Sequence, residues 1–290
     1  MSKNVVIFLN GIRGVEVIKY LKKKNYTIDL VVVENKKIIK ILKNKFFIKK
    51  IYFSKNIKNS YKFLVNFKNN IFISAGFSQI FSKNIIKIPK FFLNLHAGRL
   101  PKYRGGSPLN WQIINNERYC GISIIQVKSE IDTGGIFGQK KIKLTLDDNI
   151  QTVHKKVNLE FPKLLYIVLE KIIKKKVKFL KQNNQKAIYW HQRNDLDGYI
   201  DFRSKKANEV YNFVRALSYP YKGAWALTDN FKKVRILKVK LQKYKIKGNP
   251  GHVIFLKKKG LNVVCKDRAI QILSYKFQGK KEDITKRVFI

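Results

Sequence analysis

The most informative segment of the chain is Phe91-Phe-Leu-Asn94-Leu-His96-Ala-Gly-Arg-Leu-Pro101-Lys-Tyr103-Arg104-Gly105. It begins with an apolar run typical of a buried strand, Phe91–Leu95. Asn94 and His96 lie two residues apart at the end of this run. The Leu-Pro and Arg-Gly steps that follow predict a tight loop. Leu100-Pro101 is a candidate for a cis peptide bond, because the turn is tight. The stretch therefore predicts a polar site at the carboxyl end of a strand.

Short apolar runs and helical patterns alternate on both sides of this stretch. Val5–Leu9 and Ile28–Val33 read as buried strands, with a helix from Val15 to Lys24 between them. Further strands are predicted at Ile51–Phe53, Ile71–Ser74, Gly121–Val127 and Lys140–Leu144, and further helices at Ser107–Asn115 and Asn149–Lys175. This alternation predicts an α/β fold with a doubly wound, mostly parallel sheet.

The last third of the chain has a different pattern. Gln182–Phe202 is loop-like, and Ala207–Leu217 is an amphipathic helix whose inward face holds Val210, Phe213, Val214 and Leu217. From Val234 onward, short alternating runs predict about five strands of a small β-barrel. We therefore expect a catalytic domain over residues 1–200, then a linker helix and a small β-rich C-terminal domain over residues 201–290.

Three loops, 75–78, 96–106 and 129–135, leave the carboxyl ends of predicted parallel strands, the edge where open α/β sheets bind ligands. They would bring Asp132 to Asn94 and His96. Asn94 and His96 can donate N–H groups to the oxyanion of acyl transfer, and Asp132 can raise the basicity of His96 and take the proton of an attacking amine. No Ser or Cys lies near a base in the sequence, which favours direct transfer over an acyl-enzyme.

The composition indicates a globular protein and argues against a membrane-spanning one. The hydrophobic content of 45% is that of a globular chain, and no apolar run is long enough to cross a membrane. No signal peptide is recognisable, so a cytoplasmic location is expected. Cys120 and Cys265 have no partner at metal-ligand spacing and are predicted to be reduced, and no metal site is expected. The histidines other than His96 lack a matching partner in the sequence and read as structural or surface residues: His154, His191 and His252.

The net charge of +44 is compatible with nucleic-acid binding, since lysine and arginine neutralise phosphates. The lysines are spread over nearly every segment, however, which favours a compositionally biased, solvated surface over a dedicated nucleic-acid face. Only ten of the 62 basic residues are arginines. Several of these lie inside motifs, where a rigid guanidinium can hold phosphate or carboxylate.

The pattern Asn94-x-His96, Leu100-Pro101-x-x-Arg104-Gly105 and Asp132-x-Gly134 resembles the 10-formyltetrahydrofolate-dependent formyltransferases. The resemblance implies an enzyme that takes its formyl group from 10-formyltetrahydrofolate, with Asn94, His96 and Asp132 as catalytic residues. It also implies a folate pocket lined by Ala75, Gly76, Phe77 and the loop around Ile131. One departure is Gly98-Arg99, where the family commonly has Ser-Leu.

Within this family, the run from Leu100 to Trp111 is similar to nucleotide-sugar N-formyltransferases, and so is the Asp197-Gly198 region. The implied substrate is the amine of a nucleotide-linked amino sugar, as in lipopolysaccharide or other glycan biosynthesis. A diphosphate needs cations and a base needs an aromatic platform. The candidates for these substrate-binding roles are Tyr103, Arg104, Trp111, Arg193 and Arg215, with Tyr221 as a further aromatic. Packing beside the sheet explains Trp111 equally well.

Two other functions stay open. Methionyl-tRNA formyltransferase, with tRNA as partner, agrees with the charge and the C-terminal domain, although the segment after Val33 lacks the long basic loop that looks typical of that enzyme. A catalytically silent RNA-binding module agrees with the charge but not with an intact Asn94, His96 and Asp132. No membrane partner is expected, and a homodimer stays open as the oligomeric state.

Overall fold

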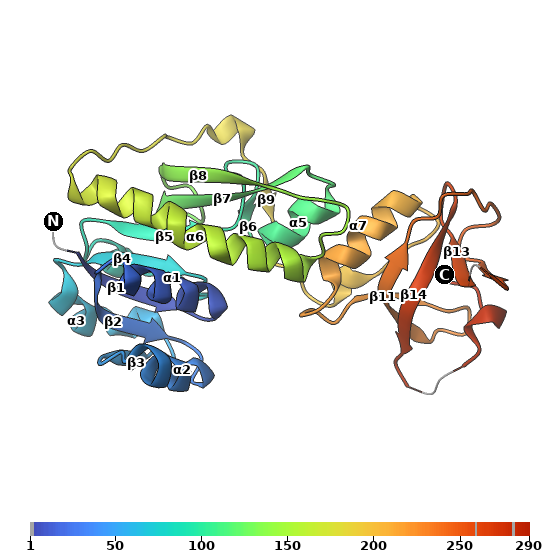
Figure 1. Cartoon of the computed structure of the whole chain (residues 1–290), viewed down its shortest axis with the longest axis horizontal. Coiled ribbons are helices and arrows are strands. Elements are labelled where there is room, and N and C mark those ends of the chain that lie inside the picture. The colour runs from blue at the N-terminus through green and yellow to red at the C-terminus, as the bar shows by residue number, and fades with distance from the viewer. Residues whose placement is uncertain (1–2, 259, 280–281) are drawn as a thin grey trace. The chain divides into compact units, whose positions relative to one another are not determined.

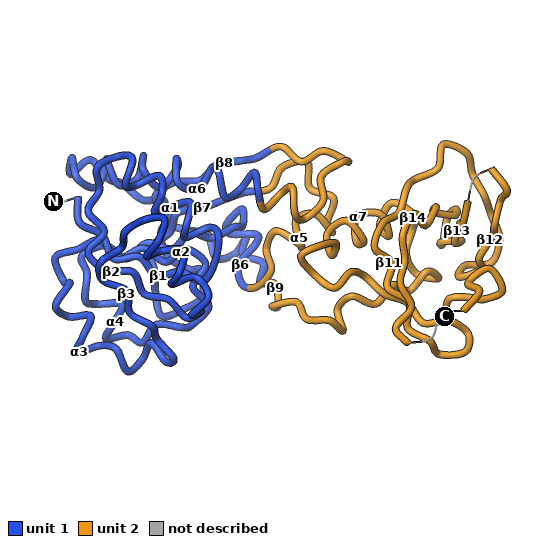
Figure 2. The backbone as a smooth tube through the Cα atoms, turned by 60° about the horizontal axis from the view of Figure 1, so that its bottom comes forward, with its two compact units in different colours: residues 1–105, 121–142, 155–189 blue, residues 106–120, 143–154, 190–290 orange. Residues whose placement is uncertain are grey.

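A computed structural model of the chain describes residues 3–258, 260–279 and 282–290. They form two compact units (Figure 2), the first of residues 1–105, 121–142 and 155–189, and the second of residues 106–120, 143–154 and 190–290. The division is therefore not a single cut near residue 200. The second unit includes helix α5 (Pro108–Ile114) because this helix packs on α7 (Ala207–Leu217), where the Asn110 amide donates to the carbonyl of Ala216 at 2.8 Å.

A seven-stranded sheet in the order β3-β2-β1-β4-β5-β7-β8 dominates the first unit (Figure 1). The strands span Asn4–Leu9 (β1), Thr27–Val33 (β2), Ile51–Phe53 (β3), Ile71–Ala75 (β4), Phe92–His96 (β5), Tyr119–Gln126 (β7) and Ile136–Lys143 (β8). The five strands from β3 to β5 pair in parallel. This arrangement confirms the predicted mostly parallel α/β sheet, with strand bounds within a few residues of the expected ones.

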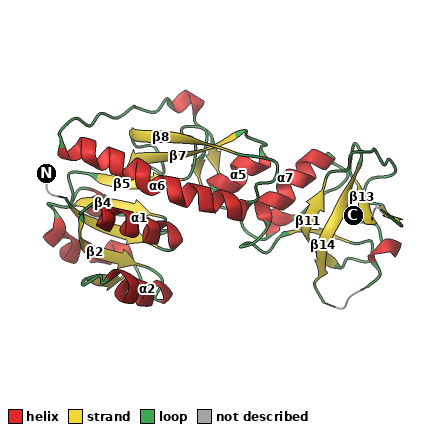
Figure 3. Cartoon of the chain, in the orientation of Figure 1, coloured by secondary structure: helices red, strands yellow, loops and turns green. Residues whose placement is uncertain are grey.

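Both faces of this sheet are covered by helices, which is why its strands read as continuous apolar runs. On one face, Val6 and Phe8 of β1 pack with Ile57, Leu64 and Ile85. These three residues belong to η1 (Ile57–Ser60), α3 (Tyr61–Leu64) and α4 (Lys83–Ile86). Helices α1 (Ile12–Lys23) and α6 (Ile150–Ile173) lie side by side along the sheet in Figures 1 and 3, with the rings of Tyr20 and Tyr166 6.1 Å apart.

The direction of β7 differs from the prediction. It pairs antiparallel with β5, so that His96 faces Ser123 and Leu93 faces Gln126. The expectation that loop 129–135 leaves the carboxyl end of a parallel strand is therefore wrong. A strand buried on both faces has the same apolar composition in either direction, so the sequence pattern carries no information on its polarity.

The second unit contains a five-stranded antiparallel sheet in the order β10-β11-β14-β13-β12. Its strands span Ala224–Leu227 (β10), Lys233–Lys240 (β11), Val253–Leu256 (β12), Gly260–Val264 (β13) and Ala269–Phe277 (β14). Beyond the two edge strands, the C-terminal segment bridges Phe289 to Thr228 and Val288 to His252. The predicted small β-rich domain is thus confirmed, with its two edges joined by the end of the chain.

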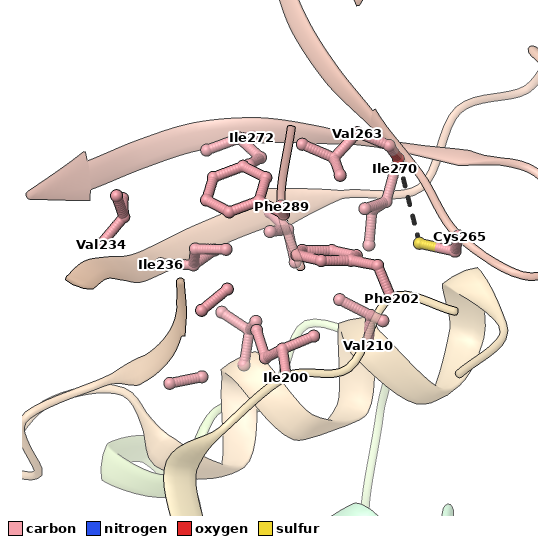
Figure 4. Packing of buried hydrophobic residues seen from close by; sticks show 14 of the residues in the cluster. Ile200, Phe202, Val210, Val234, Ile236, Val263, Cys265, Ile270, Ile272 and Phe289 are labelled. Atoms are coloured by element: carbon pink, nitrogen blue, oxygen red, sulfur yellow. Dashed lines mark hydrogen bonds between the residues drawn. The ribbon is translucent and has the colours of Figure 1, made fainter. Parts of the chain in front are cut away.

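Helix α7 covers this sheet with the face that the periodicity predicts: Val210, Phe213, Val214 and Leu217 are all buried. Figure 4 shows Val210 of this helix near Phe202 and Phe289, whose ring centroids are 5.4 Å apart. Cys265 lies in the same core, where burial raises the pKa of its thiol to about 12, and neither cysteine forms a disulfide. The remaining short elements are α2 (Lys37–Phe46), η2 (Val65–Phe67), β6 (Arg104–Gly105), η3 (Asn184–Lys186), β9 (Tyr189–Trp190), η4 (Leu196–Gly198) and η5 (Ile284–Lys286).

In the part of the chain that the structure describes, no helix is both long and apolar enough to cross a membrane.

Candidate active site

Strand β5 places Asn94 and His96 on one face of the sheet, because side chains two residues apart in a strand point the same way. Asn94 pairs with Ser74 of the parallel strand β4, and His96 pairs with Ser123 of the antiparallel strand β7. His96 is the last residue of the strand and is buried, while Asn94 is half-buried. The two side chains therefore occupy fixed positions at the carboxyl end of a central strand.

The imidazole of His96 is held from both sides. Its Nε2 lies 2.5 Å from the carbonyl oxygen of Tyr103, and its Nδ1 lies 3.3 Å from Oδ2 of Asp132. A carbonyl only accepts hydrogen bonds, so Nε2 carries a proton and Nδ1 is the nitrogen that faces the carboxylate. His96 and Asp132 can consequently pass one proton between Nδ1 and Oδ2 while the ring keeps its orientation.

The loop after β5 approaches His96 closely at Gly98. A Cβ atom at this position would lie 2.4 Å from Nε2 of His96 and 2.5 Å from the carbonyl oxygen of Tyr103. Both distances are far below van der Waals contact, so the observed loop requires glycine here. The Leu100-Pro101 peptide in the same loop is cis, which confirms the prediction. The departure from the family pattern at Gly98 is thus the residue that lets the Tyr103 carbonyl reach the imidazole.

Asp132 reaches His96 although β7 runs away from the carboxyl end of β5. The segment after β7 turns back, and the N–H of Gln126 donates to the carbonyl of Gly135 at 3.0 Å. Asp132 sits in this turn with a left-handed φ of 55° and a side chain that is 9% exposed. Its Oδ2 also accepts the N–H of Gly105 at 2.9 Å. The sheet edge therefore brings the amide, the imidazole and the carboxylate together, as predicted, but by a hairpin and not by a parallel strand.

A pocket of about 130 Å³ opens beside Asn94 and Asp132. Its lining mixes apolar and polar side chains from three segments: Ser74, Phe77, Gln79, Ile80, Phe81, Asn94 and residues 125–132. Two of the predicted folate-binding residues, Phe77 and Ile131, are part of this lining, and Ala75 and Gly76 directly precede Phe77. Among the described residues, none forms a hydrogen bond with the Asn94 side chain, so its amide keeps its hydrogen-bonding capacity for a ligand.

The structure corrects the roles predicted for Tyr103 and Arg104. Arg104 is 2% exposed, and its guanidinium donates to Gln182, Asn184 and Tyr189 at distances of 2.8 to 3.1 Å. Tyr103 is 3% exposed. Neither side chain can therefore meet a substrate in this structure, because Arg104 is committed to acceptors of the chain and Tyr103 is covered.

The other three predicted substrate-binding residues lie in the second unit. Arg215 is 8% exposed and donates to Asn212 and to the carbonyls of Thr145 and Asp148, so it too is committed within the chain, and burial lowers its pKa. The ring of Trp111 packs against Trp190 at a centroid distance of 4.7 Å, in agreement with the packing alternative.

Arg193 is less buried than Arg104 and Arg215, although its Nη2 also donates to a carbonyl of the chain, that of Asp197, at 2.6 Å. Its guanidinium lies 4.9 Å from the ring centroid of Trp111, and burial lowers its pKa. It borders a pocket of about 300 Å³ that Tyr221 and Lys222 also line. Of the three, Arg193 is thus the one beside an open volume.

Two side-chain contacts were not predicted from the sequence. His191 has a partner after all, since its Nε2 lies 2.8 Å from Oδ1 of Asp197, a residue whose pKa is lowered chiefly by the N–H of Asn194. Gln182 was not singled out at all, yet its amide contacts the Asp132 loop. No local signal marks Gln182, because its partners lie about 50 and 80 residues away in the chain.

Comparison with known proteins shows the family of the chain. Residues 4–169 match the family model described as formyl transferase, and residues 194–287 match that described as formyl transferase, C-terminal domain. The chain is 35% identical over 232 residues to the bifunctional polymyxin resistance protein ArnA of Wigglesworthia glossinidia brevipalpis, covering 78% of this chain but only 34% of that protein. It is 31% identical over 219 residues to the methionyl-tRNA formyltransferase of Clostridium novyi, covering 75% of this chain and 70% of that protein.

Solved structures show the same fold at lower identity. WlaRD, a sugar 3N-formyl transferase crystallised with dTDP and 5-N-formyl-THF, superposes with a TM-score of 0.72 at 22% identity, covering 97% of this chain and 99% of that chain. The N-formyltransferase of Helicobacter canadensis, in complex with folinic acid and dTDP-3-aminofucose, gives 0.68 at 22% identity, covering 94% and 99%. HypX of Aquifex aeolicus gives 0.69 at 16% identity in its complex with tetrahydrofolic acid, where this chain spans 44% of its length.

Proposed function

We propose a reaction for this chain, which belongs to the formyl transferase family and is a formyltransferase. It transfers the formyl group of 10-formyltetrahydrofolate to the amine of a nucleotide-linked amino sugar. The observation that carries the proposal is the buried contact of 3.3 Å between His96 Nδ1 and Asp132 Oδ2, next to an Asn94 amide that faces a pocket.

The three side chains divide the work of acyl transfer. The amide N–H of Asn94 is placed to donate to the oxygen of a formyl group in the pocket, and stabilising that oxygen as negative charge develops lowers the barrier. The attacking amine must lose a proton, and the His96–Asp132 pair can accept it. The tetrahedral intermediate then collapses: the bond between the formyl carbon and N10 of the folate breaks, and the pair can return one proton to N10, which leaves as tetrahydrofolate. Because Nε2 of His96 stays bonded to the Tyr103 carbonyl at 2.5 Å, proton transfer does not require the ring to turn.

The pocket suits the folate donor in chemical character. Phe77, Ile80 and Ile131 offer apolar surface for a flat heteroaromatic ring, while Asn94 and the backbone of residues 125–132 offer hydrogen-bonding groups. Structural neighbours with the same fold were crystallised with 5-N-formyl-THF, folinic acid or tetrahydrofolic acid. These observations support 10-formyltetrahydrofolate as the co-substrate and Ala75, Gly76, Phe77 and Ile131 as the residues around it.

The acceptor rests on different support. Two neighbours match this chain over nearly the full length of both chains: WlaRD, a sugar 3N-formyl transferase, and an N-formyltransferase in complex with dTDP-3-aminofucose. In the second unit, the pocket lined by Arg193, Tyr221 and Lys222 combines cations with an aromatic ring, the groups that a nucleoside diphosphate needs. We therefore keep Arg193 as the proposed phosphate-binding residue.

Methionyl-tRNA formyltransferase is the second candidate. Curated relatives with that name include the enzymes of Malacoplasma penetrans and Clostridium novyi, and the net charge of +44 would favour a polyanion. Binding of tRNA should weaken steeply as salt rises, whereas a small diphosphate ligand releases few counterions and should respond much less.

The test offers the purified chain 10-formyltetrahydrofolate with dTDP- and UDP-linked amino sugars and, separately, with methionyl-tRNA. Product is identified by mass spectrometry at low and high salt, and His96→Ala controls for contaminating activity. The proposal expects a formylated nucleotide sugar at a rate that changes little with salt. Formylation of methionyl-tRNA alone, lost at high salt, would support the second candidate, and no formylated product with any acceptor would contradict both.

A further inference from the structure

The Asp132 loop is held in place by an amide that belongs to no sequence motif. The side-chain Nε2 of Gln182 donates to the carbonyl of Asp132 at 2.7 Å and to the carbonyl of Gly134 at 2.7 Å. On its other side, Oε1 of Gln182 accepts from Nε of Arg104 at 3.1 Å and from Nη2 at 2.9 Å. Both N–H groups and both oxygen lone pairs of this amide are therefore in use.

We infer that Gln182 is a positioning residue for the catalytic loop, and that Arg104 orients it. The inference rests on the proposed function, because it assigns the role through Asp132. The guanidinium can only donate and the two loop carbonyls can only accept, so the amide has a single favourable orientation. A flipped amide would point its N–H groups at Arg104 and its oxygen at two carbonyls. The pair Arg104–Gln182 thus acts as a rigid link to the backbone of residues 132 and 134.

The burial of Arg104 supports a positioning role over a stabilising one. Arg104 is 2% exposed, and no carboxylate forms an ion pair with it among residues 3–258, 260–279 and 282–290. Its acceptors are neutral: Gln182, Asn184 Oδ1 at 2.8 Å and Tyr189 Oη at 2.9 Å. Burying a charged guanidinium without a counter-charge lowers the stability of the fold. The planar guanidinium of Arg104 nevertheless holds several acceptor groups in a fixed orientation, which is the function expected of a positioning residue.

The loop itself has few other restraints. Ile131, next to Asp132, is 56% exposed, and residues 128–130 are exposed as well. Asp132 adopts a φ of 55°, in the left-handed region that glycine enters more readily than residues with a side chain. Among the described residues, the hydrogen bonds and ion pairs that remain for Asp132 without Gln182 are made by its carboxylate alone, to Gly105 and His96. Loss of the link would therefore let the carboxylate drift from Nδ1 of His96.

The discriminating variant is Gln182→Glu. The new carboxylate keeps two acceptors for Arg104 and gains an ion pair, but it offers no N–H to the loop and repels the two carbonyls. Gln185→Glu is the matched control, since this exposed neighbour makes the same charge change and its side chain has no hydrogen bond to the described residues. Misplacing a catalytic group by about 1 Å can cost roughly 100-fold in rate.

We expect Gln182→Glu to lower kcat by roughly tenfold or more while its melting temperature stays at or above that of the wild type. The Gln185→Glu variant should keep the wild-type kcat. In ¹⁵N NMR at a fixed pH, the chemical shifts of the His96 ring nitrogens, assigned with a His96→Gln variant, should differ in Gln182→Glu, because Nδ1 has lost its carboxylate neighbour. This NMR readout needs no turnover, so it tests the positioning role even if the wild type formylates none of the acceptors tested.

Two outcomes would overturn the inference. One is a Gln182→Glu variant with the kcat and the His96 ¹⁵N chemical shifts of the wild type. The other is a loss of kcat that is matched by a loss of melting temperature while the His96 ¹⁵N chemical shifts stay unchanged, since Gln182 would then only support the fold.

Discussion

Replacing Asp132 with asparagine removes the charge at the centre of the proposed mechanism and leaves the shape of the side chain. In the structure, Oδ2 of Asp132 accepts the N–H of Gly105 at 2.9 Å and lies 3.3 Å from Nδ1 of His96. The side-chain oxygen of an asparagine can still accept the N–H of Gly105, so the loop should keep its conformation. The asparagine amide cannot accept a proton from His96. The pair of side chains at positions 96 and 132 can then no longer take up the proton that the attacking amine loses.

The size of the effect follows from the burial of the pair. The Asp132 and His96 side chains are 9% and 6% exposed, so water cannot replace the lost carboxylate. A hydrogen bond to a charged group contributes about 1.5–3 kcal/mol. If that stabilisation is available only as the proton leaves the amine, the variant should lose roughly 10- to 150-fold in kcat.

Steady-state kinetics on the best acceptor would measure this loss, with circular dichroism and thermal melting as checks on folding. The control is Asp147→Asn, an exposed aspartate for which we expect wild-type kinetics. A folded Asp132→Asn enzyme with kcat within about twofold of the wild type would show that this carboxylate takes no part in proton transfer.

Asn94→Ala should also lower kcat by roughly tenfold or more, because it removes a donor to the developing oxyanion, while thermal melting stays near that of the wild type; an unchanged kcat would exclude this role. Gly98→Ala places a Cβ 2.5 Å from the backbone oxygen of Tyr103, so we expect a loss of about 1–3 kcal/mol in unfolding free energy by denaturant titration, and equal stability would show that the loop relaxes freely. In the second unit, Arg235 and then Lys233 lower the pKa of Asp195. The resulting stability is present above the unfolded value of about 3.9 and is lost as the pH falls towards the lower folded value. Asp195→Asn should therefore flatten the fall in stability below about pH 4, and an unchanged acid limb would contradict the assignment.

Helices and strands with a local pattern of apolar residues could be predicted from the amino-acid sequence. An apolar run ending in Asn94 and His96 predicts a strand that presents both side chains at its end, and β5 does so. The period of 3.6 residues in Ala207–Leu217 predicts which face of α7 is buried, and the structure agrees. These inferences succeed because a helix or a strand has a fixed repeat, so burial on one side leaves a mark in neighbouring residues.

The direction of β7 and the hydrogen-bond partners of Arg104 became known from the folded structure and could not be predicted. A fully buried strand is apolar in either direction. The local sequence therefore does not indicate that β7 pairs antiparallel or that a hairpin returns Asp132 to His96. An arginine in a loop motif can hold a substrate phosphate or an internal acceptor with the same five N–H groups. In the structure Arg104 donates to Gln182, about 80 residues further along the chain, a partner that lies next to it only in the folded protein.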